Sequence, residues 1–275
     1  MELKFVKCHI DSRFKESGTH SSFQYTLAEP FNTPEGCVVY VDNVSIPHSW
    51  YSVDAWNNSL YIAEYGSSYS VRKVTIPSNS YTATTLKIGI SDALNANRPS
   101  GIGAYTVVHT PSTNKIAISS DPNVGSTFHI LTDDEIKFYD QALLQINKGD
   151  PQSFNGVLRN REGFQGSRAQ DYTYSSLYTS GSIDILAHHN VYIHSSLSSF
   201  NTLGPNGASD IICKVPVNAN YGVVLNHNSS GSQDYQAIGK RTLSTIFFSL
   251  RDAYGHEIDL QGASWSLSLV FAIKE

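Results

Sequence analysis

The sequence has few of the features that mark a secreted, membrane-spanning or disulfide-bonded protein. Its three cysteines, Cys8, Cys37 and Cys213, are scattered and form no CxxC pair. This odd set argues against a disulfide framework and indicates folding in a reducing compartment. No window approaches the roughly 18 consecutive apolar residues of a membrane span. Because the stretch MELKFVKCHIDSRFKESG has no long apolar core, we expect no signal peptide.

Charged residues are also scarce. They make up 16% of the sequence, below the usual level of about 25%, and the formal net charge is −5. Broad binding to nucleic acid or to anionic membranes needs a basic surface. We therefore expect no specific nucleic-acid partner and no membrane insertion.

The common catalytic signatures are absent. The chain has no GxSxG, HExxH, GxxxxGK[ST] or GxGxxG motif, which removes the usual serine-hydrolase, zinc-peptidase, P-loop and dinucleotide-binding interpretations. Asp133 and Asp134 could serve glycosidase or calcium chemistry, but their position at a predicted helix start explains them through the helix dipole. We expect no enzyme activity, no catalytic residue and no cofactor-binding residue.

Two polar clusters have both a functional and a structural interpretation. His188, His189 and His194 in AHHNVYIH could supply imidazoles to a metal, or they could cap a turn and occupy a half-exposed strand face. Because no cysteine or carboxylate stands at useful local spacing, we expect no metal site. The basic run Arg159, Arg161 and Arg168 could contact a phosphate, but a solvated loop is the favoured interpretation.

An aromatic cluster is the one candidate ligand platform. Trp50, Tyr51 and Trp56 in HSWYSVDAW could stack on sugars as a glycan platform. Alternatively, the same side chains could plug the end of a β-sandwich, which is the favoured interpretation.

The residues that are abundant favour strands. Sixteen Tyr and 12 Phe stand among many Ser, Thr and Asn, a composition typical of strands and turns. The closing stretch alternates strictly, which predicts a strand with one buried face. Its predicted core residues are Trp265, Leu267, Leu269, Phe271 and Ile273. Because so apolar an edge strand would be sticky, we expect it to lie between strands from the beginning of the chain.

The middle of the chain has a different pattern. Helical spacing predicts a helix over 82–97 with Thr82 as N-cap, and Thr132 with Glu135 predicts a capping box for a second helix through about residue 144. The polar stretch 147–170 predicts a long exposed loop or the seam of an insertion. Strands are expected to resume at 182–187.

Several motifs in order carry a resemblance to a known family. They are NVSIPHSWYSV, TIPSNSYTATTLKIGISDALN, NKIAI, SSLSSFNTLGPNGASDIICKVPVNANYG and LRDAYGHEIDLQGASWSLSLVF. This succession resembles the penton (vertex) capsid proteins of polintons, virophages and related tailless double-stranded DNA viruses. The similarity extends from about Phe23 to Ile273, and its most specific part is the carboxy-terminal third.

The resemblance implies an all-β fold, a single jelly-roll β-sandwich with an inserted module containing one or two short helices. Residues 1–54 and 181–275 would form the jelly roll and residues 55–180 the inserted upper module. Five copies would form a homopentamer at the capsid vertex of the virion, after folding in the host cytoplasm or nucleus. Major capsid protein trimers would surround this ring, and an internal minor capsid protein is a further partner.

Two other function classes remain open at this point. A glycan- or receptor-binding jelly-roll module, such as a viral attachment protein or lectin, would use the platform at Trp50, Tyr51 and Trp56. A hydrolase has the least support. A jelly roll interleaves strands from both ends of the chain, which would explain why a core strand comes last.

Overall fold

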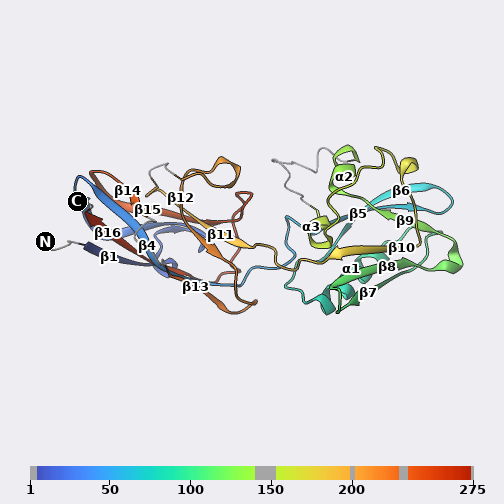
Figure 1. Cartoon of the computed structure of the whole chain (residues 1–275). Helices are drawn as coiled ribbons and strands as arrows, with labels where there is room; N and C mark the ends of the chain where they lie inside the picture. Colours follow the sequence, from blue (N-terminus) through green and yellow to red (C-terminus); the bar gives the residue numbers. More distant parts are fainter. Residues whose placement is uncertain (1–4, 140–152, 199–201, 229–234, 274–275) are drawn as a thin grey trace. The chain divides into compact units, whose positions relative to one another are not determined.

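Two compact units make up the chain. In the computed structural model, residues 5–139, 153–198, 202–228 and 235–273 are described. Unit 1 consists of Met1–Trp50 and His188–Glu275, and unit 2 consists of Tyr51–Ala187 (Figure 1). The sequence places these divisions at 54/55 and 180/181, a few residues from those of the structure. Within the described part, no helix is long and apolar enough to cross a membrane.

Unit 1 is built from two five-stranded antiparallel sheets. Sheet I has the order β1-β16-β4-β13, with β14 also pairing with β4, and sheet II has the order β12-β11-β15-β3-β2. Their strands are β1 (Phe5–Asp11), β2 (Ser17–Gly18), β3 (Ser22–Thr33), β4 (Cys37–Pro47), β11 (Asn190–Ser195), β12 (Ile211–Pro216), β13 (Val224–Asn228), β14 (Gln236–Ala237), β15 (Arg241–Arg251) and β16 (Ser266–Ile273). The protein is thus predominantly β, as the composition predicts.

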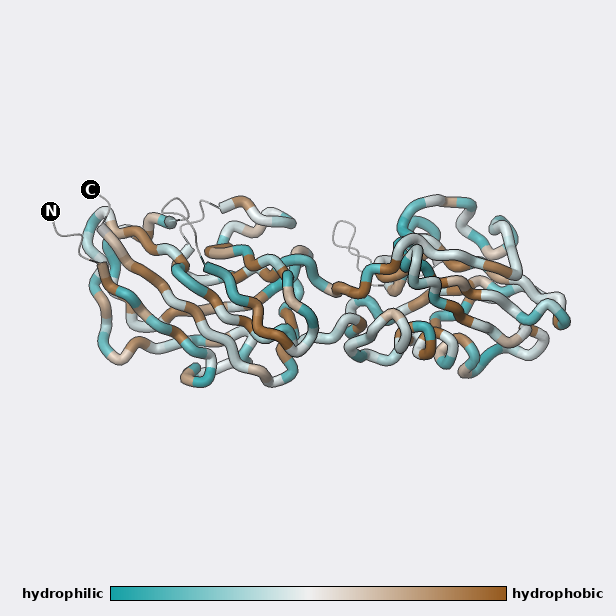
Figure 2. Tube along the Cα trace, turned by 60° about the horizontal axis from the view of Figure 1, so that its bottom comes forward, coloured by the Kyte–Doolittle hydropathy of each residue, from teal (hydrophilic) through white to brown (hydrophobic). Residues whose placement is uncertain are grey.

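The last strand lies between two early ones. Leu269 of β16 pairs with Cys8 of β1 on one side and with Val41 of β4 on the other. Apolar and polar residues alternate along such strands, visible as brown and teal segments in Figure 2. A strand inserted in this position buries its apolar face on the opposite sheet without leaving a sticky edge.

The core of unit 1 joins the two sheets through aromatic side chains. Phe23 of sheet II lies 5.6 Å from Phe248 and 5.8 Å from Trp265, measured between ring centroids. Trp265 also donates a hydrogen bond from Nε1 to the carbonyl of His20 at 2.7 Å. Buried members of the predicted core strand are Trp265, Leu267, Leu269 and Phe271. The side chain of Ile273 lies outside the described residues.

The other face of β16 is more covered than the sequence predicts. Ser264, Ser266 and Ser268 are expected to point to solvent, unit 2 or a neighbouring subunit. Ser264 and Ser266 are half-buried, but Ser268 is buried and its hydroxyl lies 2.8 Å from Nδ1 of His9 on β1. A residue of unit 1 itself therefore covers the outer face at Ser268.

Unit 2 contains two three-stranded sheets and short helices. Sheet III has the order β6-β5-β9, and sheet IV has the order β10-β8-β7. The elements are β5 (Ser59–Tyr65), β6 (Tyr69–Thr75), α1 (Ala83–Asn95), β7 (Tyr105–Thr110), β8 (Lys115–Ser120), β9 (Thr127–Ile130), α2 (Asp133–Tyr139), α3 (Asn155–Leu158) and β10 (Leu177–Ser182).

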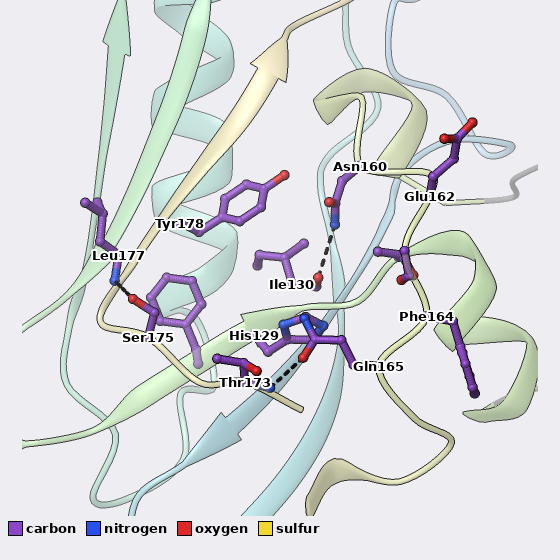
Figure 3. Close-up of a pocket in the computed structure, with 13 residues that line it drawn as sticks. His129, Ile130, Asn160, Glu162, Phe164, Gln165, Thr173, Ser175, Leu177 and Tyr178 are labelled. Atoms are coloured by element: carbon purple, nitrogen blue, oxygen red, sulfur yellow. Dashed lines mark hydrogen bonds between the residues drawn. The ribbon is translucent and has the colours of Figure 1, made fainter. Parts of the chain in front are cut away.

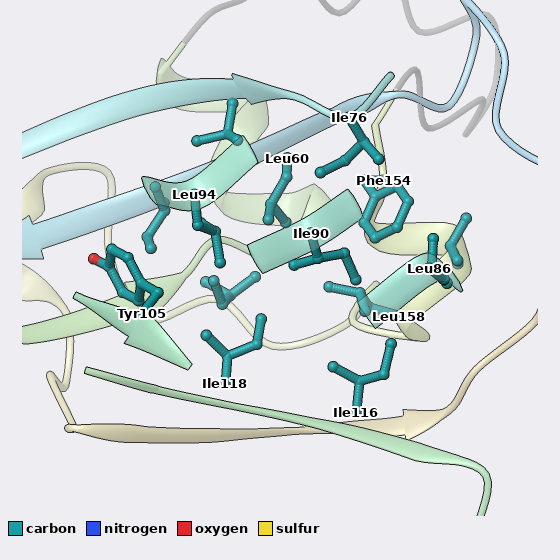
Figure 4. Close-up of a cluster of buried hydrophobic side chains, with 14 of the residues drawn as sticks. Leu60, Ile76, Leu86, Ile90, Leu94, Tyr105, Ile116, Ile118, Phe154 and Leu158 are labelled. Carbon is teal, nitrogen blue, oxygen red and sulfur yellow. The ribbon is translucent and has the colours of Figure 1, made fainter. Parts of the chain in front are cut away.

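Helix α1 supplies one side of the unit 2 core. Thr82 is its N-cap, as predicted, and Thr82 and Thr85 form a reciprocal capping box. The helix packs against both sheets and against α3 through a cluster that Figure 4 shows from within. Its labelled members are Leu60, Ile76, Leu86, Ile90, Leu94, Tyr105, Ile116, Ile118, Phe154 and Leu158.

The predicted capping box of α2 is present. The backbone N–H of Thr132 donates to Glu135 Oε2 at 2.9 Å, and the N–H of Glu135 donates to Thr132 Oγ1 at 3.3 Å. Helix α2 is described as far as Tyr139. The predicted continuation to 144 lies outside the described residues.

In the middle of the chain, the predicted strand at 182–187 is wrong, and the predicted exposed loop is confirmed for the mostly exposed residues 159–168 but wrong for 153–158. Within the predicted exposed loop 147–170, residues 153–158 are largely buried, because Phe154 and Leu158 fill the core beneath α1; residues 147–152 lie outside the described residues. The predicted strand at 182–187 is replaced by β10, which ends at Ser182. Beyond it, the N–H of Asp184 donates to the carbonyl of Val157 and not to a sheet neighbour.

Candidate assembly surfaces

Sheet I ends in two strand edges at opposite ends of its order. Among the described residues, β1 pairs only with β16, while β13 and β14 pair only with β4. The outer N–H and C=O groups of such strands can pair with another chain. These two edges are called the β1 edge and the β13 edge below.

The β1 edge combines apolar exposure with anchored charges. Phe5 and Val6 are exposed, and Val6 is 47% accessible although its register partner Phe271 is buried. Beside them, Lys7 Nζ lies 2.6 Å from Asp42 Oδ2. The hydrogen bond from Lys7 holds the pKa of Asp42 below its ordinary value, so this carboxylate remains charged at neutral pH.

The β13 edge also exposes apolar side chains. Tyr221, Val223 and Val224 are exposed, with Val224 at 46%. Backbone hydrogen bonds hold this approach to the strand: the N–H of His48 donates to the Val223 carbonyl at 2.9 Å, and the N–H of Gly222 donates to the His48 carbonyl at 2.8 Å. The β13 edge is therefore a segment of fixed backbone conformation that exposes apolar side chains.

The predicted histidine cluster is divided between two carboxylates. Nδ1 of His194 lies 2.7 Å from Asp210 Oδ1, whereas Nδ1 of His188 lies 3.9 Å from Asp252 Oδ2. The carbonyl of His189 accepts a backbone hydrogen bond from Val217. Across the part of the chain that the structure describes, no group of three or more His, Cys, Asp or Glu could hold a metal ion.

The predicted glycan platform does not form. Trp50 is only 2% accessible and its ring lies 4.3 Å from that of His48, so its face is not available to a sugar. Tyr51 is half-buried, and Trp56, at 42% exposure, belongs to unit 2. Trp50 instead packs inside unit 1, as in the structural interpretation of the cluster.

The acidic pair and the basic run have local partners. Asp133 accepts hydrogen bonds from Ser153 at 2.9 Å and from Asn155 at 3.2 Å, and burial raises its pKa. Asp134 pairs with Lys137 at 2.8 Å. In the basic run, Arg159 pairs with Asp184 and Arg161 lies 3.7 Å from Asp133, while Arg168 is exposed.

A buried charge network in unit 2 was not predicted from the sequence. The carboxylate of Glu64 is fully buried and accepts hydrogen bonds from Arg72 Nη2 and from the Tyr105 hydroxyl, both at 2.8 Å. Arg72 also donates to the carbonyls of Leu94 and Ala96 at the end of α1. The sequence does contain a signal for this network, since Glu64 is the one acid in the apolar run YIAEY. An acid on a buried strand needs a partner.

Of the comparisons with known proteins, the one with solved structures bears on the fold. No protein-family model and no curated protein matches the sequence. The structure is similar to the crystal structure of the selenomethionine-labelled mavirus penton protein, with a TM-score of 0.53 and 12% sequence identity. The match covers 99% of each chain. The two proteins therefore share a fold along their whole lengths, including both units.

Proposed function

We propose that this chain is a structural capsid protein that forms the pentameric vertex, or penton, of an icosahedral double-stranded DNA virus. The whole-length similarity to a viral penton protein supports this proposal. The absence of the common catalytic motifs from the sequence is consistent with a protein that works through its surfaces and not as an enzyme.

Unit 1 is proposed to be a single jelly roll. The strands that precede unit 2 contribute to both sheets, with β1 and β4 in sheet I and β2 and β3 in sheet II. Later strands pair directly with these early ones, since β16 lies between β1 and β4, and β15 lies beside β3 with β11 on its other side. Interleaving of strands from both ends of a chain is the arrangement expected of a jelly roll.

The observation that carries the proposed ring is the pair of open edges on sheet I. A closed ring uses heterologous contacts, in which one surface of a subunit meets a different surface of its neighbour. The β1 edge and the β13 edge are two such surfaces, each with a strand that is paired on one side only and with exposed apolar side chains. We assign the subunit contact to these edges.

The proposed vertex position implies further neighbours. Major capsid protein trimers would surround the ring, and a minor capsid protein is a candidate partner on its inner side. The site of action is then the virion, where the ring would close the fivefold position of the shell.

Negative-stain imaging and light scattering of the purified full chain test this proposal. We expect rings of five subunits, and we expect Val6→Lys or Val224→Lys to weaken them because a lysine would replace an exposed apolar contact. Lys214→Glu on the exposed part of β12 is the control and should leave the rings intact. Trimers, or rings that neither edge variant weakens, would contradict the proposed vertex assembly.

A further inference from the structure

A cavity in unit 2 has the lining of a small-molecule site. Its volume is about 360 Å³, within the range of about 300–1,000 Å³ that is usual for ligand pockets. It opens between β9, β10 and the segment 160–165 (Figure 3). Its side chains include Phe128, His129, Asn160, Glu162, Phe164 and Tyr178.

The hydrogen-bonding groups at this cavity are fixed by their neighbours. Asn160 donates from Nδ2 to the carbonyls of Ile130 at 3.1 Å and Leu131 at 3.2 Å. These bonds fix the amide orientation and leave Oδ1 free to accept. His129 Nε2 lies 2.7 Å from the carboxylate of Glu135, and its ring stacks on that of Tyr172 at 4.7 Å.

Two polar atoms at the cavity lack a protein partner. Neither Tyr178 Oη nor Asn160 Oδ1 has a hydrogen-bond partner among the residues that the structure describes. In Figure 3, Tyr178 extends from β10 toward Asn160. Burial raises the pKa of Tyr178, so its hydroxyl stays protonated and able to donate at neutral pH.

Hydrogen bonds hold the segment 160–165 in place at both sides of the cavity. The Thr132 hydroxyl donates to the carbonyl of Gly163 at 2.6 Å, and the N–H of Gln165 donates to Glu135 at 3.1 Å. The Gln165 side chain in turn accepts from the N–H of Thr173 at 2.6 Å. A preformed site of this kind costs little ordering on binding.

The lining disfavours an anionic ligand. It contains no Lys or Arg, so no cation is available to pair with a phosphate, sulfate or carboxylate. A phenol donor and an amide acceptor match sugar hydroxyls, which both donate and accept. The ring of Phe164 does not take part, because it points away from these groups in Figure 3 and packs on Phe138 with ring centroids 5.0 Å apart.

We propose that this cavity binds a neutral monosaccharide unit of a glycan, with Tyr178 donating to and Asn160 accepting from its hydroxyl groups. The site lies wholly within unit 2 and does not depend on ring formation. A vertex protein with such a site would carry a second activity, recognition of a neutral glycan.

Saturation-transfer NMR on the full chain tests the site. The probes are methyl glycosides of glucose, galactose, mannose, N-acetylglucosamine and N-acetylgalactosamine, with N-acetylneuraminic acid and inorganic phosphate as anionic probes. We expect at least one neutral glycoside to bind in the millimolar range. Binding of the anionic probes alone, or of no probe, would overturn the proposal.

Two variants place the binding at this cavity. Tyr178→Phe removes only a hydroxyl without a protein partner and should weaken binding about threefold to tenfold, the usual worth of one hydrogen bond. Asn160→Ala, which removes the acceptor, should weaken it by a similar factor. Tyr69→Phe removes an exposed hydroxyl elsewhere in unit 2 and should leave affinity unchanged. If neither cavity variant weakens binding, the site is wrong.

Discussion

The two units differ in how their buried cores are built. Unit 1 assembles its core from strands at both ends of the chain and fills it with side chains such as Phe23, Phe248 and Trp265. Unit 2 comes from one continuous segment and buries two carboxylates, Glu64 and Glu135, each with hydrogen-bonded partners.

This contrast separates two kinds of surface. Unit 1 leaves the strands at both ends of sheet I open, so it has surfaces that another subunit can cover. In unit 2, hydrogen-bond networks hold loops in fixed positions, as Glu135 does for Gln165, and these loops shape a cavity. We therefore associate assembly with unit 1 and ligand recognition with unit 2.

The largest expected effect comes from a charge in the last strand. Truncating a buried leucine costs about 2–5 kcal/mol, and a buried unpaired carboxylate costs more. Leu269→Asp, or deletion of Ser264–Glu275, should therefore unfold unit 1. Methyl NMR should show loss of the native signals of Ile246 and Leu250 in unit 1, while Leu86 and Ile90 in unit 2 keep theirs.

The matched control is Ser266→Thr, at a half-buried position on the other face of the same strand. This variant should keep both sets of signals. Simultaneous loss of both sets in Leu269→Asp would show that the units do not fold separately. A deletion variant that still melts cooperatively with native unit 1 signals would show that β16 is not a core strand.

A smaller effect, confined to unit 2, is expected from Arg72→Met. The substitution leaves the Glu64 carboxylate buried without its cation, which costs about 3–5 kcal/mol in comparable cases. Urea denaturation followed by methyl signals should show this loss for unit 2 only. The double variant Glu64→Leu with Arg72→Met should recover most of the stability, and Lys73→Met, at an exposed neighbour, should change little. A loss of equal size in Lys73→Met would contradict the network.

The smallest effect is a pH dependence that depends on Glu135. Burial alone would raise the pKa of Glu135, but hydrogen bonds from His129 and from the Thr132 and Gln165 N–H groups outweigh it and lower the pKa. A lowered folded-state pKa gives stability that is present above the ordinary value of about 4.3 and is lost as pH falls through the folded-state pKa.

Thermal melts between neutral and acidic pH measure this contribution. Glu135→Gln should destabilise unit 2 at neutral pH by about 1–3 kcal/mol, because it leaves buried donors poorly paired. The difference between wild type and variant should shrink as the pH falls below about 4. Glu162→Gln, at an exposed carboxylate, is the control. A difference that stays constant with pH would contradict the role of Glu135.

Local sequence signals predicted the local structure well. Strict alternation from Trp265 onward predicted β16, and Thr82 and the Thr132–Glu135 pair predicted helix starts. Each of these predictions depends only on residues that are close together in the sequence. The prediction of an exposed loop was wrong for residues 153–158 because it followed the polar composition of the sequence around them. Phe154, Val157 and Leu158 have the i, i+3, i+4 spacing of a buried helical face.

The candidate surfaces could not be predicted in the same way. Exposure of Val6 and Val224 follows from which strands end a sheet, and that depends on partners far apart in sequence, such as Val6 with Phe271. The cavity likewise joins Asn160 to Tyr178 through tertiary packing. Conversely, the aromatic residues Trp50 and Trp56, which are close in sequence, belong to different units.

Cysteine cross-linking between the two edges of sheet I tests the proposed ring most directly. In a Cys8→Ser, Cys213→Ser background, Val6→Cys marks the β1 edge and Val224→Cys marks the β13 edge, and a short bismaleimide joins nearby thiols. Heterologous contacts predict no cross-link within either single variant, dimers when the two are mixed, and a ladder that ends at five subunits for the double variant. Cross-links within a single variant, or a ladder that ends at two or three subunits, would contradict a vertex ring.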